Sequence, residues 1–197
     1  MPRTRLFTTE QAPDGLLSEI RSLLDRAFEG SFSEEDWEHT IGGWHAIVSD
    51  GGAVVSHAAV VARSLVAGDR SFRAGYVEGV GTLPSRAGEG LGSLVVGRIT
   101  SLVRDQFQLG ALSTGRHGFY ERLGWERWQG QTFARRDGER IRTEEDDDGI
   151  MVLPKAQAVE LANRAMDVLE KENRLRGEID AGKTLSEVAY LQKWEKR

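Results

Sequence analysis

The chain has no cysteine among its 197 residues. A protein without cysteine forms no disulfide and offers neither a thiolate metal ligand nor a thiol nucleophile, which excludes several classes of enzyme. The sequence also lacks an apolar run near the roughly 20 residues of a membrane-spanning helix, and its first residues lead into no apolar signal segment. We therefore expect a soluble, cytoplasmic protein with no membrane partner.

Acidic residues outnumber basic ones: the sequence has 31 aspartates and glutamates and 26 lysines and arginines, which gives a formal net charge of -5. Affinity for nucleic acid depends on basic residues that neutralise phosphates, and the sequence shows no basic patch, so we expect no nucleic-acid partner. The acidic residues cluster at 34–38 and 144–148. If both clusters face one cleft they attract a cation, whereas each run alone is more often solvated surface.

The first half of the chain predicts two short helices followed by three antiparallel strands. Apolar residues at helical spacing mark the first helix: Leu16, Ile20, Leu23, Leu24 and Phe28. Ser33, directly before an acidic run, marks the start of the second helix. The β-rich runs span 44–48, 53–62 and 73–82, with turn signals at 50–52 and 67–69.

A glycine-rich loop follows the third strand, with Gly88, Gly90 and Gly92 at alternate positions and a helical pattern behind them. Glycines leave room for a ligand, and the unpaired N–H groups at a helix start bind anions, so the loop suits a pyrophosphate with Arg86 nearby. A flexible connection is an equally simple reading. A dinucleotide-binding unit is disfavoured because the preceding strands look antiparallel.

The remaining pattern predicts a short strand at 107–113, a helix turn at 118–123 and closing strands at 125–135 and 149–153. The character changes at Pro154, after which the sequence predicts two amphipathic helices, the second beginning at the capping-box pattern of 184–187. We therefore expect a catalytic domain over 1–154 and a helical C-terminal extension over 155–197.

Six segments together resemble a known family of acetyltransferases: Asp36–Ala46, Gly75–Val80, Gly88–Gly92, Gln108–Ser113, Phe119–Trp125 and Asp146–Gly149. They are similar to segments of the GCN5-related N-acetyltransferases (GNAT) and, more specifically, of the aminoglycoside 2′-N-acetyltransferases. The resemblance implies an α/β (α+β) fold with a mixed, mostly antiparallel central sheet flanked by helices. It implies acetyl-CoA as acetyl donor and a small cationic aminoglycoside as acceptor, and we expect a homodimer.

The resemblance also implies the catalytic residues. Glu78 would remove the proton of the substrate ammonium through a water, and Tyr120 would protonate the departing CoA sulfur. From the residues alone, the favoured interpretation of Glu78 is a strand-end carboxylate with structural hydrogen bonds. Without the resemblance, Tyr120 could be interpreted as an ordinary aromatic residue of the core, although a buried hydroxyl needs a hydrogen-bond partner.

The binding residues are likewise implied by the resemblance. Those for acetyl-CoA are Val80, Gly81, Thr82, Arg86, Ala87, Gly88, Glu89, Gly90, Leu91, Gly92 and Ser93. Backbone groups of Val80 and Thr82 would pair with the pantetheine arm and polarise the thioester carbonyl. Those for the aminoglycoside are Ser31, Asp36, Glu78, Gly79, Ser113 and Asp147. Carboxylates suit a polycation, because each charge-assisted hydrogen bond contributes about 1.5 to 3 kcal/mol.

The sequence departs from the family pattern at three places. Ala87 holds the position usual for the loop arginine, and Ser31 stands where the family often has an acidic substrate ligand. The family's own C-terminal segment is missing after Pro154. The segment that follows resembles the closing helices of the RraA-like aldolases, which raises the hypothesis of a fusion.

His39 and His45 are the remaining candidates for a base or a metal ligand. An apparent helix end separates them and no third ligand is arranged for zinc, so structural hydrogen bonding is favoured and no metal is predicted.

The sequence thus predicts an antibiotic-resistance enzyme that acetylates the 2′-amine of aminoglycosides. Two alternatives stay open: an acetyltransferase for a polyamine or another amine, and a non-catalytic protein that binds CoA and a cationic drug.

Overall fold

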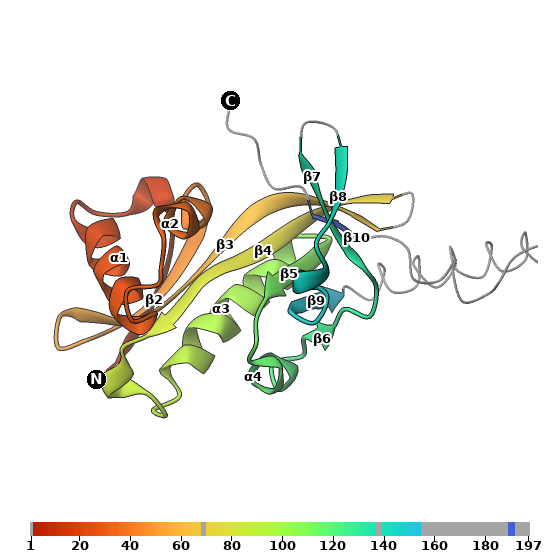
Figure 1. Cartoon of the computed structure of the whole chain (residues 1–197). Coiled ribbons are helices and arrows are strands. Elements are labelled where there is room, and N and C mark those ends of the chain that lie inside the picture. The colour runs from red at the N-terminus through yellow and green to blue at the C-terminus, as the bar shows by residue number, and fades with distance from the viewer. Residues whose placement is uncertain (1, 68–69, 137–138, 155–188, 192–197) are drawn as a thin grey trace, which may run out of the picture. The chain divides into compact units, whose positions relative to one another are not determined.

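The computed structural model of the chain describes residues 2–67, 70–136, 139–154 and 189–191. They form two compact units (Figure 1). Unit 1 comprises Met1–Ala62 and Gly75–Phe107, and unit 2 comprises Arg63–Ala74 and Gln108–Arg197. Two long strands, β3 (Ala53–Ala67) and β4 (Arg70–Thr82), contribute to both units. Each unit is described by itself below.

Unit 1 contains the N-terminal helices and strands. Its helices are α1 (Leu16–Ala27), α2 (Glu34–Thr40) and α3 (Leu91–Gln106), with short 3₁₀ helices at Thr9–Gln11 and Pro84–Arg86. Strand β1 (Arg3–Thr8) pairs antiparallel with β2 (Trp44–Asp50), and β2 pairs antiparallel with β3. The two predicted N-terminal helices and the β-rich runs of this unit are confirmed, whereas β1 was not predicted.

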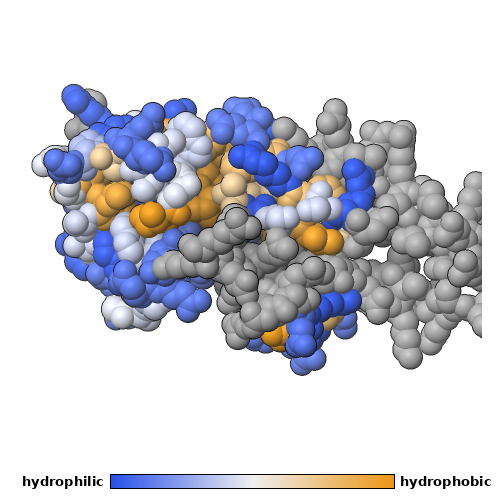
Figure 2. Space-filling view, turned by 90° about the horizontal axis from the view of Figure 1, so that it is seen from above, coloured by the Kyte–Doolittle hydropathy of each residue, from blue (hydrophilic) through white to orange (hydrophobic). Residues whose placement is uncertain are grey.

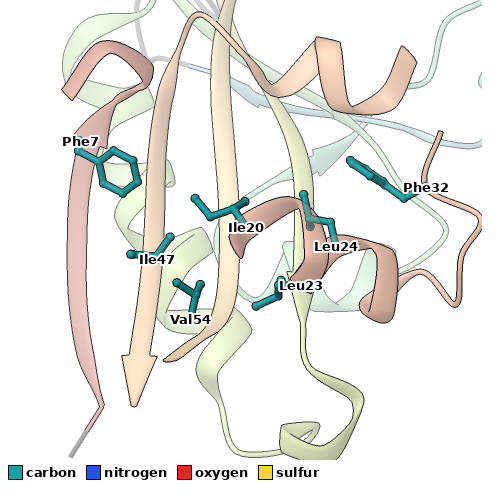
Figure 3. Packing of buried hydrophobic residues seen from close by; sticks show 7 residues of the cluster. All are labelled: Phe7, Ile20, Leu23, Leu24, Phe32, Ile47 and Val54. Carbon is teal, nitrogen blue, oxygen red and sulfur yellow. The ribbon is translucent and has the colours of Figure 1, made fainter. Parts of the chain in front are cut away.

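The core of unit 1 forms where α1 packs on the strands (Figure 3). Ile20, Leu23 and Leu24 recur at the i, i+3, i+4 spacing of one helix face, and all three are completely buried. They meet side chains from the strands and from the loop before α2: Phe7, Ile47, Val54 and Phe32. Helix α1 lies on one face of these strands and α3 on the other, as Figure 3 shows.

Unit 2 contains the C-terminal strands. Strand β5 (Leu109–Ser113) pairs antiparallel with β9 (Ile150–Pro154), which also pairs with the short β6 (Glu126–Arg127). Strands β7 (Thr132–Arg136) and β8 (Glu139–Arg142) form a hairpin. The unit also holds α4 (His117–Glu121) and a 3₁₀ helix at Glu144–Asp146. The strand order is β6, β9, β5, β4, β3, β10 (Ala189–Leu191), β7, β8.

Strand β10 (Ala189–Leu191) pairs antiparallel with β3 and parallel with β7, so the described sheet is mixed and mostly antiparallel, as expected. The sequence predicted a helix after residue 187, and this prediction is wrong for Ala189–Leu191, whose backbone groups pair with two strands instead of closing helical turns. The first predicted helix of the extension and most of its likeness to the aldolases lie outside the described residues. The domain boundary at residue 154 stays a prediction.

The predicted closing strand at 125–135 is divided into β6 and β7. Between them the backbone N–H of Trp128 donates to the carbonyl of Ile150 at 3.0 Å, and Gly130 lies against the Trp128 ring. The chain turns there, and the second strand pairs with β8, which was not predicted.

None of the helices in the described ranges is long and apolar enough to cross a membrane. On the face drawn in Figure 2, hydrophilic residues cover much of the described surface, with hydrophobic residues visible between them.

The packing of α1 predicts the effect of truncating one core residue. Leu24→Ala should lower the free energy of unfolding by about 2 to 5 kcal/mol, because the fully buried side chain leaves a cavity. Urea unfolding followed by circular dichroism measures this loss. Leu94→Ala is the matched control, since Leu94 is 48% exposed on α3 and its truncation should leave the midpoint almost unchanged. Equal shifts in both variants would contradict this core assignment.

Candidate active site

The glycine loop of unit 1 has the geometry of an anion site. It connects the 3₁₀ helix after β4 to α3, and Gly88 and Gly90 adopt φ values of +84° and +78°. Residues that carry a side chain rarely adopt these φ angles, which explains why glycine occupies both positions. A Cβ at either position would meet no atom within 4 Å, so the space beside the loop is open to a ligand. Helix α3 begins at Leu91, so the backbone N–H groups of Leu91, Gly92 and Ser93 have no partner within the helix. Such N–H groups are suited to bind phosphate oxygens.

Arg86 is already engaged by two carboxylates in this loop. Its Nε donates to Glu89 at 2.7 Å and its Nη2 donates to Asp50 at 3.1 Å. The hydrogen bond from Arg86 lowers the pKa of Glu89, and the same bond raises the pKa of Arg86 further above its usual value. A phosphate contact by Arg86 would therefore have to compete with Glu89 and Asp50.

The end of β4 brings the predicted base close to helices α1 and α2. Glu78 is half-buried on the strand, and the next residue, Gly79, has φ +54°. A Cβ on Gly79 would lie 2.7 Å from Thr40 Cγ2, and one on Gly81 would lie 2.8 Å from Leu24 Cδ2. A side chain at either position would therefore collide with α1 or α2 unless these helices shifted, and the positive φ of Gly79 also favours glycine.

Two predicted substrate ligands of unit 1 have structural contacts of their own. The Oδ2 atom of Asp36 accepts from the backbone N of Ser33 at 2.9 Å and from its Oγ at 2.8 Å, closing the capping box of α2. The hydroxyl of Ser31 donates to the carbonyl of Phe28 at 2.6 Å, in the turn after α1. Both residues are exposed.

An open hollow of about 650 Å³ lies at α1 and α2 in unit 1. It is lined by Leu17, Ser18, Arg21, Ser22, Glu34, Trp37 and Ile41. Arg21 is the cation of this hollow, and it pairs with Asp25 at 2.9 Å and with Glu34 at 3.1 Å. None of the predicted site residues lines the hollow.

In unit 2 the structure brings Ser113 to the acidic loop. Ser113 lies at the end of β5, and a Cβ on Gly149 would be 3.0 Å from its Oγ. The backbone N of Thr114 donates to the carbonyl of Gly149 at 2.8 Å. His117 at the start of α4 hydrogen-bonds to the carbonyl of Asp148 at 2.6 Å. Ser113 and the loop that carries Asp147 therefore share one end of the sheet.

Asp147 is the anchor of this loop. Its Oδ1 accepts from Thr132 N at 2.8 Å, from Thr132 Oγ1 at 2.9 Å and from Arg142 Nη1 at 2.7 Å, and its Oδ2 accepts from Arg142 Nη2. The hydrogen bonds from Arg142, followed by those from Thr132, hold the pKa of Asp147 far below its ordinary value. The carboxylate is therefore charged, and it ties the β7–β8 hairpin to the loop.

Tyr120 lies on α4 with its ring packed between aromatic neighbours. The ring makes edge contacts with Phe119 and Trp125, at centroid distances of 4.9 Å and 6.3 Å. Burial raises its pKa to about 12, with a smaller opposing effect of the Arg116 charge. The phenol is therefore protonated at neutral pH and able to donate a proton.

The sequence interpretation missed a hydrogen-bonded histidine pair beneath Glu78. His45 Nδ1 lies 3.0 Å from His57 Nε2, and His57 Nδ1 lies 2.7 Å from the carbonyl oxygen of Gly79. The structural hydrogen bonding expected of His45 is thus present. The signal was available in the turn at 50–52, because the resulting register pairs Ile47 with His57 and puts both histidines on one face of the hairpin.

Comparison with known proteins identifies the family. The family described as "Acetyltransferase (GNAT) domain" matches residues 9–128. The chain therefore belongs to the GNAT acetyltransferases. It is 41% identical over 152 residues to the aminoglycoside 2′-N-acetyltransferase of Mycolicibacterium fortuitum, a match that covers 76% of this chain and 78% of that protein.

Two solved structures share the fold of this chain. The GNAT protein YhbS of Escherichia coli, solved in complex with CoA, has a TM-score of 0.58 at 16% identity and covers 77% of this chain and 79% of its own. Escherichia coli ElaA has a TM-score of 0.56 at 14% identity, over 77% of this chain and 99% of its own. The expected mixed, mostly antiparallel α/β fold is confirmed.

The anchoring of Asp147 predicts a pH-dependent stability effect. The folded-state pKa lies below the unfolded one, so the stabilisation is present above the unfolded pKa and is lost as pH falls through the folded pKa. Asp147→Asn should lower Tm at neutral pH, and the difference from wild type should shrink below about pH 4. Thermal unfolding at several pH values measures this. The exposed Asp148→Asn should leave Tm unchanged, and a pH-independent difference for Asp147→Asn would refute the linkage.

Proposed function

We propose that this protein transfers the acetyl group of acetyl-CoA to the 2′-amine of aminoglycosides and thereby inactivates these antibiotics. The observation that carries the proposal is the 41% identity, over 76% of the chain, to an aminoglycoside 2′-N-acetyltransferase. Membership in the GNAT acetyltransferases and the open glycine loop support acetyl-CoA as the acetyl donor.

Residues of β4 and the glycine loop would hold acetyl-CoA. The amides of Gly88 to Ser93 suit the pyrophosphate, because the loop glycines leave open space and α3 directs its first N–H groups there. Backbone groups of Val80 and Thr82, on either side of Gly81, would bind the pantetheine arm and the thioester carbonyl. When bound, acetyl-CoA supplies an acetyl group on a thioester, whose carbon–sulfur bond breaks as the carbon–nitrogen bond forms.

Glu78 is the proposed general base. An ammonium has no lone pair, so the 2′-amine must lose a proton before it attacks, and a carboxylate at the end of β4 can take that proton through a water. The half-buried position restricts the side chain.

Tyr120 is the proposed general acid. Its raised pKa, about 12, keeps the proton on the phenol at neutral pH, so the residue is in the donating form when the sulfur departs. The edge contacts with Phe119 and Trp125 fix the ring, so that the hydroxyl has a defined direction.

Acidic and hydroxyl side chains are the proposed ligands of the cationic acceptor. Asp36 retains a carboxylate oxygen beyond the one used in its capping box. Asp147 is held in the charged form by Arg142, and Ser113 lies beside its loop. Ser31 contributes a hydroxyl in place of a charge. The net charge of -5 adds a general attraction for a polycation.

The location and assembly belong to the same proposal. We expect the enzyme to work in the cytoplasm, where acetyl-CoA is available, and to form a homodimer. Sedimentation equilibrium at several concentrations tests the dimer.

A panel of acceptors tests the activity. Thiol release from acetyl-CoA should occur with aminoglycosides that carry a 2′-amine and should be absent with a matched compound bearing a 2′-hydroxyl, because only the amine accepts the acetyl group. Mass spectrometry of the product locates the modification. Spermidine is the control for a general polyamine acetyltransferase: faster turnover of spermidine than of any aminoglycoside would refute the proposed substrate.

The proposed roles predict the behaviour of two conservative variants. Glu78→Gln and Tyr120→Phe should each lower kcat by about 100-fold or more, the range typical of a lost general base or acid. Acetyl-CoA affinity, measured by calorimetry, should stay close to wild type. Phe119→Leu serves as a control beside Tyr120, since it changes the packing and leaves the phenol in place. Full activity of both variants would show that other groups move these protons.

A further inference from the structure

A continuous chain of hydrogen bonds runs through the core of unit 1 to the backbone beside Glu78. Thr9 Oγ1 lies 2.8 Å from His45 Nε2, His45 Nδ1 lies 3.0 Å from His57 Nε2, and His57 Nδ1 lies 2.7 Å from the Gly79 carbonyl oxygen. Both histidines are fully buried, and neither has a role in the chemistry proposed above. Two buried imidazoles that end on one carbonyl therefore need an explanation.

The partners fix the direction of every bond in the chain. A carbonyl oxygen only accepts, so His57 carries its proton on Nδ1, and its Nε2 accepts from His45 Nδ1. His45 Nε2 then accepts from the hydroxyl of Thr9, which accepts from the N–H of Gly42 at 2.9 Å. The carbonyl oxygen of Gly43 is a second acceptor for the same hydroxyl proton, at the longer distance of 3.3 Å against 2.8 Å to His45 Nε2. Burial lowers the pKa of His45 to about 4 and that of His57 to about 3, so both rings are neutral at neutral pH, as this pattern requires.

The chain ends at the peptide whose N–H, that of Val80, is among the groups proposed above to bind the thioester carbonyl. The peptide bonds of the described residues are trans, so the Gly79 carbonyl and the Val80 N–H point in opposite directions within their shared peptide plane. Because His57 holds the carbonyl, the Val80 N–H is directed away from His57. Gly79 has φ +54°, a conformation from which an unsecured peptide can rotate, since glycine has few steric barriers.

We propose that His57, supported by His45 and Thr9, is a positioning residue that locks the Gly79–Val80 peptide so that the Val80 N–H faces the acyl carbonyl of acetyl-CoA. This inference rests on the proposed acetyl transfer and concerns the donor side of that reaction. A donor aimed in advance at the carbonyl oxygen stabilises the charge that develops there, which is the most effective use of a single backbone N–H.

The chain is not a proton relay. Its last acceptor is an amide carbonyl, which is a very weak base and passes no proton on, and all the donors point toward it. A relay would need a titratable group at that end. The function that fits the chain is to hold the Gly79–Val80 peptide in one orientation. Each hydrogen bond in the series polarises the next and so strengthens it.

The first test uses the free protein. Nitrogen-15 chemical shifts of the imidazoles should identify the Nδ1–H tautomer for both His45 and His57 in the wild type. A finding of the Nε2–H tautomer at His57 would overturn the proposal, because that ring could not donate to Gly79.

The second test compares two ligands that differ only in the acetyl group. Wild type should bind acetyl-CoA more tightly than CoA, and His57→Leu should reduce that preference by about 2- to 10-fold, the value of one hydrogen bond, with CoA affinity unchanged. His57→Asn keeps a donor near the Nδ1 position and should retain the preference. Thr4→Val is the control for surface changes, since Thr4 is exposed on β1. An equal loss in the Asn and Leu variants would overturn the proposal.

The third test separates positioning from general stability. With the aminoglycoside as acceptor, His57→Leu should lower kcat by about 10-fold or more while KM for the aminoglycoside stays the same, and His57→Asn should recover most of kcat. A Leu variant as fast as wild type would contradict the proposal. Absence of turnover in the wild type would refute the aminoglycoside activity alone, because the tautomer and ligand-binding results need no acceptor.

Discussion

The close approach of α1 and α2 to the end of β4 is the constraint on which unit 1 depends. Thr40, Leu24 and Ala27 lie so close to the strand that a side chain at position 79 or 81 would collide with them. The absence of these two side chains lets the helices seat directly on the strand, so that the core of α1 also supports the backbone next to Glu78. Stability and the arrangement of the proposed base are therefore determined by the same contact.

Several charged residues, in both units, make hydrogen bonds and ion pairs that stabilise the fold. Asp36 completes the capping box of α2, Asp147 anchors a hairpin, and Arg86 is held by two carboxylates. The two proposed acidic ligands differ in what these contacts leave available. Asp36 uses only its Oδ2 in the capping box, whereas both oxygens of Asp147 already accept hydrogen bonds, and a cationic substrate would have to compete with Arg142 for that carboxylate.

The sequence predicts helices better than it predicts strands in this chain. Helix α1 could be predicted because Ile20, Leu23 and Leu24 carry an unambiguous spacing, and α2 because Ser33 caps an acidic first turn. Strand β1 was missed because it is six residues long and mostly exposed, so it carries little hydrophobic pattern. Strand β8 was missed for the same reason, since only its pairing with β7 defines it.

The candidate site also has a part that the sequence predicts and a part that it does not. The glycine loop was predictable, because its backbone angles require the residue type itself. The contact of Asp147 with Thr132 and the path from Thr9 to Gly79 were not, because they join groups 12 to 36 positions apart that only the folded sheet brings together. Residue types suggest chemistry, whereas contacts of this kind require the register of the strands.

The position of Arg86 between Asp50 and Glu89 has a consequence for how a nucleotide enters the loop. The triad already carries one more negative than positive charge, so an arriving diphosphate is not drawn to a bare cation. To contact Arg86 as well as the loop amides, it must displace Asp50 or Glu89 from the guanidinium. Dissolved salt weakens the resident pairs as well as the incoming one, so the loop is buffered against changes in ionic strength that would loosen a simple phosphate–arginine contact.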